Sequence, residues 1–178
     1  VVSGAVACGA SVINFSIKDK KLRKAAAGIG QAYLISVFQQ IFTKKKLKIA
    51  QILLTRELLD SDKKRQEIYD MLHYYLNIGV VPVINENDVI DLNCFGGNDF
   101  LGARIASLLN VESLLILSTM AGSSSGVGGG EAKLQAVAML KKEGIAASIL
   151  DGKTKNILLE AFDELFDREV DLAMWGLS

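Results

Sequence analysis

Hydrophobic positions along the chain alternate between short apolar runs and longer stretches with helical spacing. Residues 22–42 have the period of an α-helix, because apolar residues recur there every three or four positions, at Ala26, Ile29, Tyr33, Val37 and Ile41. The same spacing predicts helices at 62–76, 99–109, 131–142 and 154–166. Apolar runs typical of buried strands lie at 49–54, 80–84, 113–117 and 146–150.

The regular alternation of strand and helix predicts a parallel sheet that is covered by helices on both faces. A length of 178 residues suits a single domain over 1–178. The opening segment, Val1 to Val6, is typical of a strand end and the turn after it, so we expect an earlier strand to be absent from this chain.

Composition narrows the function classes. The chain is 50% hydrophobic and 22% charged, which suits a soluble protein with a sizeable core. A net charge of +0 gives no basic excess for nucleic acid, and no apolar run reaches the roughly 18 residues of a membrane span. Cys8 and Cys94 fit a reducing compartment, hence a cytoplasmic protein. The single histidine, His73, excludes a multi-histidine metal site and makes a Ser-His-Asp triad improbable; we predict no metal-ligating residues.

Polar clusters follow the predicted strands. They are Ser3–Gly4, Thr55, Asn85 to Asp88, and Ser118–Thr119. In parallel sheets, ligands bind at the carboxyl ends of the strands, so these clusters predict a small-molecule site. Polar loops are also the default at strand ends, which leaves that explanation open.

The glycine-rich loop that runs from Gly126 to Lys133 precedes a predicted helix. Glycines let the backbone approach a phosphate, and Lys133 adds a positive charge at the same place. The loop matches neither the Walker pattern nor the dinucleotide fingerprint, and a flexible linker without a ligand is the alternative.

The other clusters also carry alternatives. Asn85 to Asp88 offers carboxylates for an ammonium group or Mg²⁺ and amides for a carboxylate, or it is only a hydrogen-bonded turn. Asp99, after Gly96–Gly97–Asn98, is a second polar group or an N-cap. Ser3–Gly4–Ala5 is a ligand-binding turn or a tight turn with a capping serine.

Taken in order, these segments resemble the amino-acid kinase family, in the branch that phosphorylates glutamate. The similarity extends from Val1 to about Gly152 and is carried by 2–7, 26–31, 51–55, 81–88, 96–99 and 128–133. It implies a three-layer α/β/α sandwich with a mainly parallel central sheet. It also implies ATP-dependent phosphorylation of the γ-carboxylate of L-glutamate, the first step of proline biosynthesis, with ATP and Mg²⁺ as cofactors. Family members assemble as homo-oligomers, so we expect one here.

The resemblance also implies roles for individual residues. The substrate glutamate is held by Ser3, Gly4, Ala5, Asp88 and Asn98. The catalytic residues are Lys133, which neutralises charge on the phosphoryl group, and Asp99, which orients the catalytic lysines. The nucleotide is held by Ser118, Thr119, Val127, Gly128, Gly129, Gly130, Glu131, Ala132 and Lys133.

Several family features are missing from this sequence. These are the first strand with its lysine-bearing glycine turn, the flap near the nucleotide, and the RNA-binding-like C-terminal domain. Gly97, Thr119 and Gly130 stand where the family usually has Asp, Asp and Met. Two alternatives therefore stay open. One is a family enzyme acting on carbamate, acetylglutamate or aspartate, and the other is a degenerate, non-catalytic amino-acid sensor.

Overall fold

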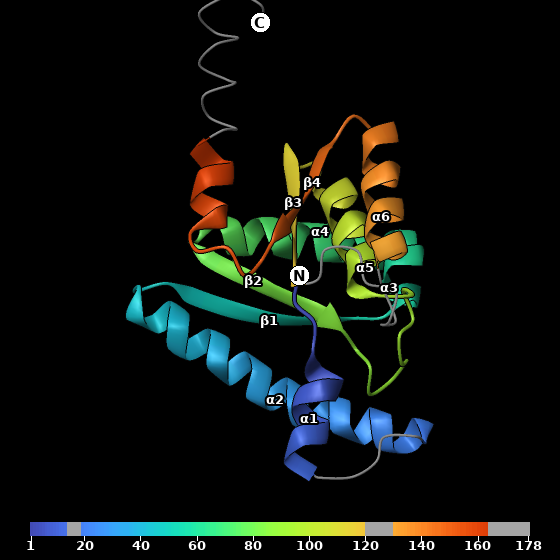
Figure 1. Cartoon of the computed structure of the whole chain (residues 1–178). Helices are drawn as coiled ribbons and strands as arrows, with labels where there is room; N and C mark the ends of the chain where they lie inside the picture. The colour runs from blue at the N-terminus through green and yellow to red at the C-terminus, as the bar shows by residue number, and fades with distance from the viewer. Residues whose placement is uncertain (14–18, 120–129, 164–178) are drawn as a thin grey trace, which may run out of the picture.

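The computed structural model describes residues 1–13, 19–119 and 130–163, whose elements are drawn in Figure 1. The helices are α1 (Ala5–Ile13), α2 (Lys20–Lys44), α3 (Arg56–Asp60), α4 (Asp62–Asn77), α5 (Asn98–Leu109) and α6 (Gly130–Lys142). The strands are β1 (Lys48–Leu54), β2 (Val80–Glu86), β3 (Ser113–Ser118) and β4 (Ala146–Asp151). Residues 157–163 are helical as well.

The predicted strands and helices before residue 152 are all present, with ends within two residues of the predicted ones. The predicted last helix, 154–166, begins at residue 157, and its end lies outside the described residues. Two short helices, α1 and α3, were not predicted. The strand end expected at Val1 to Val6 is wrong in part, because the chain turns at Gly4 and α1 begins at Ala5.

The strands pair in parallel, as predicted, and the chain has an α/β fold. β1 pairs with β2 from Lys48↔Val80 to Leu54↔Glu86, and β3 pairs with β4 from Ser113↔Ala146 to Ser118↔Asp151. In the described ranges these are two separate two-stranded sheets and not one continuous sheet. The N-terminal residues lie between them, where the Val2 amide donates to the Ile84 carbonyl at 2.8 Å.

Helices cover both faces of the β1–β2 pair. On one face, Ile84 packs in a core cluster with Leu72 of α4 and Leu101 of α5. On the other face, the Asn85 amide donates to the Gln31 side chain of α2 at 2.7 Å. Side chains alternate along a strand, so these neighbouring residues reach opposite layers.

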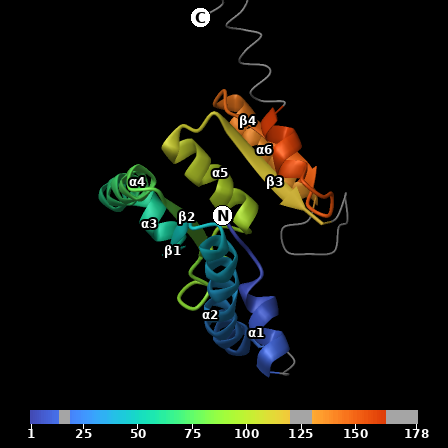
Figure 2. The same ribbon diagram turned by 90° about the vertical axis from the view of Figure 1, so that its left-hand side faces the viewer.

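Helix α5 connects the two sheets. Its Leu101 and Ile105 belong to the core under β1 and β2, while Ala103 and Ala106 belong to a second core with Ile116 of β3. Figure 2 shows α5 between α4 on one side and β3 on the other. The N-terminus of α5 is thereby fixed beside the carboxyl ends of β2 and β3.

Helices α1 and α2 pack through small residues. A Cβ added at Gly9 would lie 1.8 Å from the Ala26 carbonyl oxygen, and one added at Gly30 would lie 1.8 Å from that of Ala5. Ala26 is fully buried, whereas Tyr33 of the predicted apolar stripe is 57% exposed. The periodicity therefore predicted helix α2 correctly. The face of α2 that is buried, however, is the narrow face of small residues, which lets the backbones of α1 and α2 come into contact.

Candidate active site

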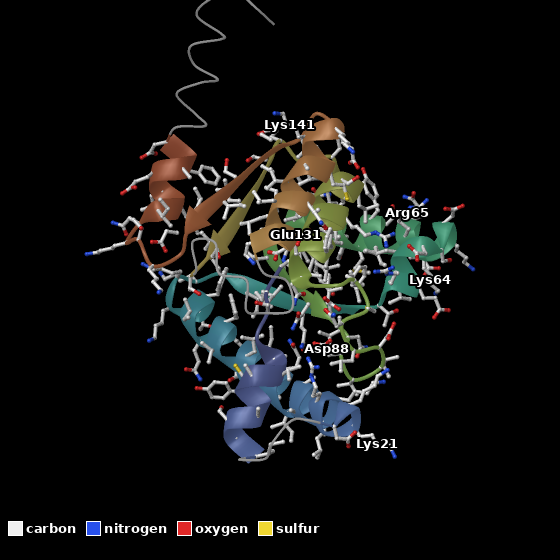
Figure 3. All side chains as sticks on the ribbon, turned by 45° about the vertical axis from the view of Figure 1, so that its right-hand side comes forward. Lys21, Lys64, Arg65, Asp88, Glu131 and Lys141 are labelled. Atoms are coloured by element: carbon white, nitrogen blue, oxygen red, sulfur yellow. The ribbon has the colours of Figure 1, made fainter. Side chains whose placement is uncertain are left out.

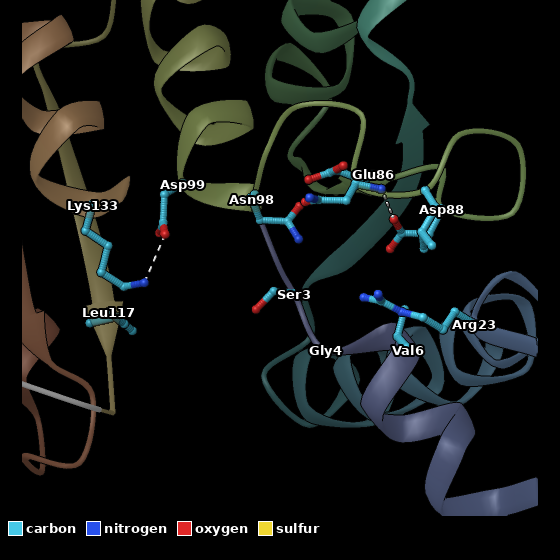
Figure 4. Close-up of a pocket in the computed structure, with 13 residues that line it drawn as sticks. Ser3, Gly4, Val6, Arg23, Glu86, Asp88, Asn98, Asp99, Leu117 and Lys133 are labelled. Atoms are coloured by element: carbon cyan, nitrogen blue, oxygen red, sulfur yellow. Dashed lines mark hydrogen bonds and ion pairs between the residues drawn. The ribbon is translucent and has the colours of Figure 1, made fainter. Parts of the chain in front are cut away.

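A pocket of about 320 Å³ opens where the carboxyl ends of β2 and β3 meet the first turns of α1, α2, α5 and α6 (Figure 4). Four residues predicted for the site from separate segments line it together: Ser3, Asp88, Asn98 and Lys133. They are up to 130 positions apart in the sequence, and the parallel topology brings them to one cavity. Of the polar strand ends predicted to converge, Ser3–Gly4 and the segment Asn85–Asp88 contribute to this pocket, whereas Thr55 and Ser118–Thr119 do not line it. Asn98 and Lys133 come from the first turns of α5 and α6.

Lys133 and Asp99 form an ion pair at one side of the pocket. Lys133 lies in the first turn of α6 and Asp99 in the first turn of α5, and the Lys133 Nζ is 2.9 Å from the Asp99 Oδ2. Their side chains are 19% and 17% exposed. The pair is thus held in place and shielded, unlike the mobile ion pairs of protein surfaces.

Asn98 begins α5 beside that pair, and its Oδ1 is buried without a hydrogen-bond partner among the residues that the structure describes. The preceding residue, Gly97, has φ 128° and ψ 151°, a backbone conformation that is essentially restricted to glycine. The glycine that stands where the family usually has Asp therefore turns the chain sharply into α5. This turn places the Asn98 amide at the pocket wall.

Asp88 and Glu86 form the opposite wall, and both are tied to the loop after β2. The Asp88 Oδ1 accepts the Asn93 amide at 2.8 Å, and the Glu86 Oε2 accepts the Phe95 amide at 3.3 Å. The segment is therefore both a hydrogen-bonded turn and a wall of the pocket. Asp88 points into the pocket in Figure 4, and it is half-buried. Its place between the loop after β2 and α2 can be followed in Figure 3.

Glu86 is only 4% exposed, and burial raises the pKa of its carboxyl group above the ordinary value of 4.5. The Phe95 and Cys94 hydrogen bonds oppose that rise. Burial also raises the pKa of the Cys94 thiol, which donates to the Glu86 carboxylate. Glu86 thus organises the loop that carries Asn93 and leads to Gly97.

The N-terminal turn contributes Ser3 and Gly4 to the pocket. Gly4 has φ 101°, and its carbonyl accepts the Cys8 amide at 2.9 Å in the first turn of α1. Ala5, which the resemblance also implied for glutamate binding, is 3% exposed and faces α2 instead of the pocket.

The residues predicted to hold the nucleotide are only partly described. Ser118 and Thr119 lie at the carboxyl end of β3, where Leu117 lines the pocket and they do not. Gly130, Glu131 and Ala132 form the start of α6, next to Lys133. The predicted residues Val127, Gly128 and Gly129 lie outside the described part of the chain.

Two charged residues that line the pocket were not predicted as site residues. Arg23 of α2 lines the cavity, and Glu86 was noted only as a member of its polar segment. Arg23 lies in a helix whose first turns carry three other basic residues, so its sequence context resembles a solvated helix end. Arg23 could have been found because it lies on the same side of α2 as the small residues.

Comparison with known proteins decides the family. Residues 1–126 match the model of the Amino acid kinase family. The chain belongs to the amino acid kinase family. Its α/β fold with parallel strands agrees with that membership.

Curated relatives of this amino acid kinase are named Glutamate 5-kinase. The protein of Lactococcus lactis is 36% identical over 68% of this chain and 48% of its own length, and that of Citrifermentans bemidjiense is 32% identical over 89% and 52%. The protein of Clostridium perfringens is 27% identical over 90% of this chain and 75% of its own length. The chain thus spans about half the length of the first two relatives.

The matched region holds most, but not all, of this amino acid kinase's pocket. Ser3, Asp88, Asn98 and Asp99 lie within residues 1–126, whereas Lys133 lies beyond them. The alignment with the Citrifermentans protein has 195 positions, more than the 178 residues of the chain, so that relative has residues without a counterpart here. In the described residues, no helix is both long and apolar enough to cross a membrane.

Proposed function

We propose that this chain catalyses the ATP-dependent phosphorylation of the γ-carboxylate of L-glutamate, which yields γ-glutamyl phosphate and ADP. The observation that supports it best is the shared pocket of Ser3, Asp88, Asn98 and Lys133, with Asp99 paired to the lysine. The relatives named Glutamate 5-kinase point to the same substrate.

The electrostatics of the pocket suit this reaction. Transfer of a phosphoryl group to a carboxylate brings two anions together, so catalysis depends on positioning and on fixed positive charge. Lys133 supplies such a charge, and Asp99 holds its ammonium group in one position. No general base is required, because a γ-carboxylate with a pKa of about 4.3 is already ionised at neutral pH.

The opposite wall suits the amino group of the substrate. The Asp88 carboxylate and the unpartnered Asn98 Oδ1 are both acceptors, and an α-ammonium group offers three donors. Ser3 presents a hydroxyl between this wall and Lys133 (Figure 4). In this arrangement Asp88 binds the substrate and takes no proton.

The nucleotide is proposed to lie on the Lys133 side, against the end of β3 and the start of α6. The N-terminus of a helix such as α6 suits phosphate oxygens, because the positive end of the helix dipole lies there. No group of three metal-ligating side chains occurs in the described residues. Magnesium is therefore proposed to enter as MgATP, held mainly by the phosphates, as is usual for this ion.

The experiment is a substrate panel with two readouts. ADP release is measured with L-glutamate, L-aspartate, N-acetylglutamate and carbamate, and γ-glutamyl phosphate is trapped with hydroxylamine as the hydroxamate. The proposal is supported if ADP and the hydroxamate form with glutamate and with none of the other three acceptors. Turnover of another acceptor in its place refutes the substrate, and glutamate binding without nucleotide binding, measured by calorimetry, indicates a sensor.

The same relationship leads us to propose a cytoplasmic homo-oligomer that acts in proline biosynthesis. Light scattering on the purified protein measures its mass in solution, and a monomer would exclude the oligomer.

A further inference from the structure

Arg23 carries a positive charge into the pocket, where no residue in the described part of the chain is paired with it. Its Nε is buried without a hydrogen-bond partner, and none of the ion pairs recorded among the described residues includes Arg23. A buried donor that has no acceptor is destabilising. The arrangement therefore points to an acceptor that the protein itself does not supply.

The backbone around Arg23 holds it in place. Asp19 caps α2 by accepting the Lys21 amide at 3.2 Å, and the Arg23 amide donates to the Asp19 carbonyl at 3.0 Å. Three residues further on, Ala26 is fully buried against α1. The guanidinium group thus projects from a fixed helix end into the cavity, as Figure 4 shows.

The pocket presents its charged groups in a definite order. Figure 4 shows Arg23 and Asp88 on one side, Lys133 on the other, and Ser3 with Asn98 between them. A second unpartnered buried atom, the Asn98 Oδ1, is an acceptor. A ligand that satisfies both orphan atoms must therefore offer an anionic acceptor to Arg23 and a donor to Asn98.

We propose that Arg23 binds the α-carboxylate of the amino-acid substrate and so fixes which of its two carboxylates is phosphorylated. This inference rests on the proposed function. The carboxylate that accepts the phosphoryl group must lie at the Lys133 side, so the other carboxylate falls at the opposite side, beside Arg23. The α-ammonium group then lies within reach of Asp88. A guanidinium group suits this task because its planar fork can grip a carboxylate with two parallel hydrogen bonds.

The test compares L-glutamate with its two monoamides by calorimetry. L-isoglutamine has a neutral α-carboxamide, and L-glutamine has a neutral γ-carboxamide. We expect the unaltered protein to prefer glutamate over both. In Arg23→Met, glutamate should bind roughly 10- to 100-fold more weakly, as expected for the loss of hydrogen bonds to a charged group. The preference over isoglutamine should then disappear, and the preference over glutamine should persist.

Two further variants guard the interpretation. Lys21→Met removes the same charge from an exposed position two residues away and should leave both preferences unchanged (Figure 3). Arg23→Lys keeps the charge without the fork and should bind glutamate with intermediate affinity. Thermal unfolding of each variant shows whether it is folded. If Arg23→Met does not fold, the comparison is made with Arg23→Lys instead.

The outcomes separate the two proposals. If the unaltered protein does not bind glutamate, the proposed function fails and this inference fails with it. If it does bind glutamate but Arg23→Met weakens glutamate and isoglutamine equally, only the role of Arg23 is refuted. Loss of the preference over glutamine in Arg23→Met would show that the substrate lies the other way round.

Discussion

Replacing Lys133 with Met removes the fixed positive charge at the side of the pocket where the phosphoryl group is proposed to transfer. The lysine ammonium lies 2.9 Å from Asp99, and both side chains are at least four-fifths shielded from solvent. Water therefore cannot readily take over the role of the lysine. Loss of one preorganised group of this kind typically lowers kcat by roughly 10²- to 10³-fold, which corresponds to about 3–4 kcal/mol in the transition state.

The same change leaves the Asp99 carboxylate without its partner. An unsatisfied, mostly buried polar group costs about 1–3 kcal/mol of stability. For a chain of this size, each kcal/mol lowers Tm by about 2–4 °C. The double variant with Asp99→Asn should regain much of this loss, because no unpaired charge remains.

The assay is ADP release at saturating MgATP and glutamate, with kcat and the glutamate KM measured for each single variant and for the double one. We expect kcat to fall much more than KM rises. If Asp99 acts through the lysine, the double variant should be no slower than Lys133→Met alone. A Lys133→Met enzyme within threefold of the unaltered kcat, or fully additive losses, would refute the reasoning.

Three further predictions address the rest of the site. Gly30→Ala should destabilise the protein by about 1–3 kcal/mol in urea unfolding, because its Cβ would meet the Ala5 carbonyl. In the control Gly28→Ala, the Cβ would meet only the tip of one side chain at 3.2 Å, so this variant should be tolerated. Equal loss of stability in the two variants would contradict the close contact. Asp88→Asn should raise the glutamate KM about 10- to 150-fold with the ATP KM unchanged, and the opposite pattern would move Asp88 to the nucleotide. The raised pKa of Glu86 means that the folded state holds this proton more tightly than the unfolded state, so its contribution to stability is present below pH 4.5 and is lost as the pH rises through the folded pKa. Glu86→Gln should therefore gain stability relative to the unaltered protein between pH 4 and 7, and parallel pH curves would disprove this.

The sequence pattern predicted most of the secondary structure because large apolar side chains mark a strand or a helix directly. It did not predict α1, which is rich in small residues, and of the apolar stripe predicted for α2 it marked only Ala26 as a fully buried position, while Tyr33 and Ile41 are exposed. Both failures have one cause: the α1–α2 contact is made by Gly9, Ala26 and Gly30, and close backbone contact leaves little trace in hydrophobicity.

The site was predictable where it depends on topology. Polar residues that follow parallel strands lie at one edge, and Asp88 after β2 shares a pocket there with Ser3 of the N-terminal turn and Asn98 at the start of α5. Arg23 could not be found in this way, because it reaches the pocket from a helix end and its neighbours are surface lysines. The assignment of Ala5 to the substrate came from resemblance alone, and Ala5 is buried and does not line the pocket that contains Ser3 and Gly4.

The backbone contact between α1 and α2 ties two walls of the pocket into one rigid piece. Gly4 directly precedes α1, and Arg23 lies near the start of α2. Where the two helices cross, their backbones are in direct contact, with no large side chains between them. The Lys24 ammonium, which donates to the Ile90 carbonyl at 2.6 Å, extends this piece to the loop after β2. We therefore expect any opening or closing of the cavity to move the serine turn and the start of α2 together, as one side of the site.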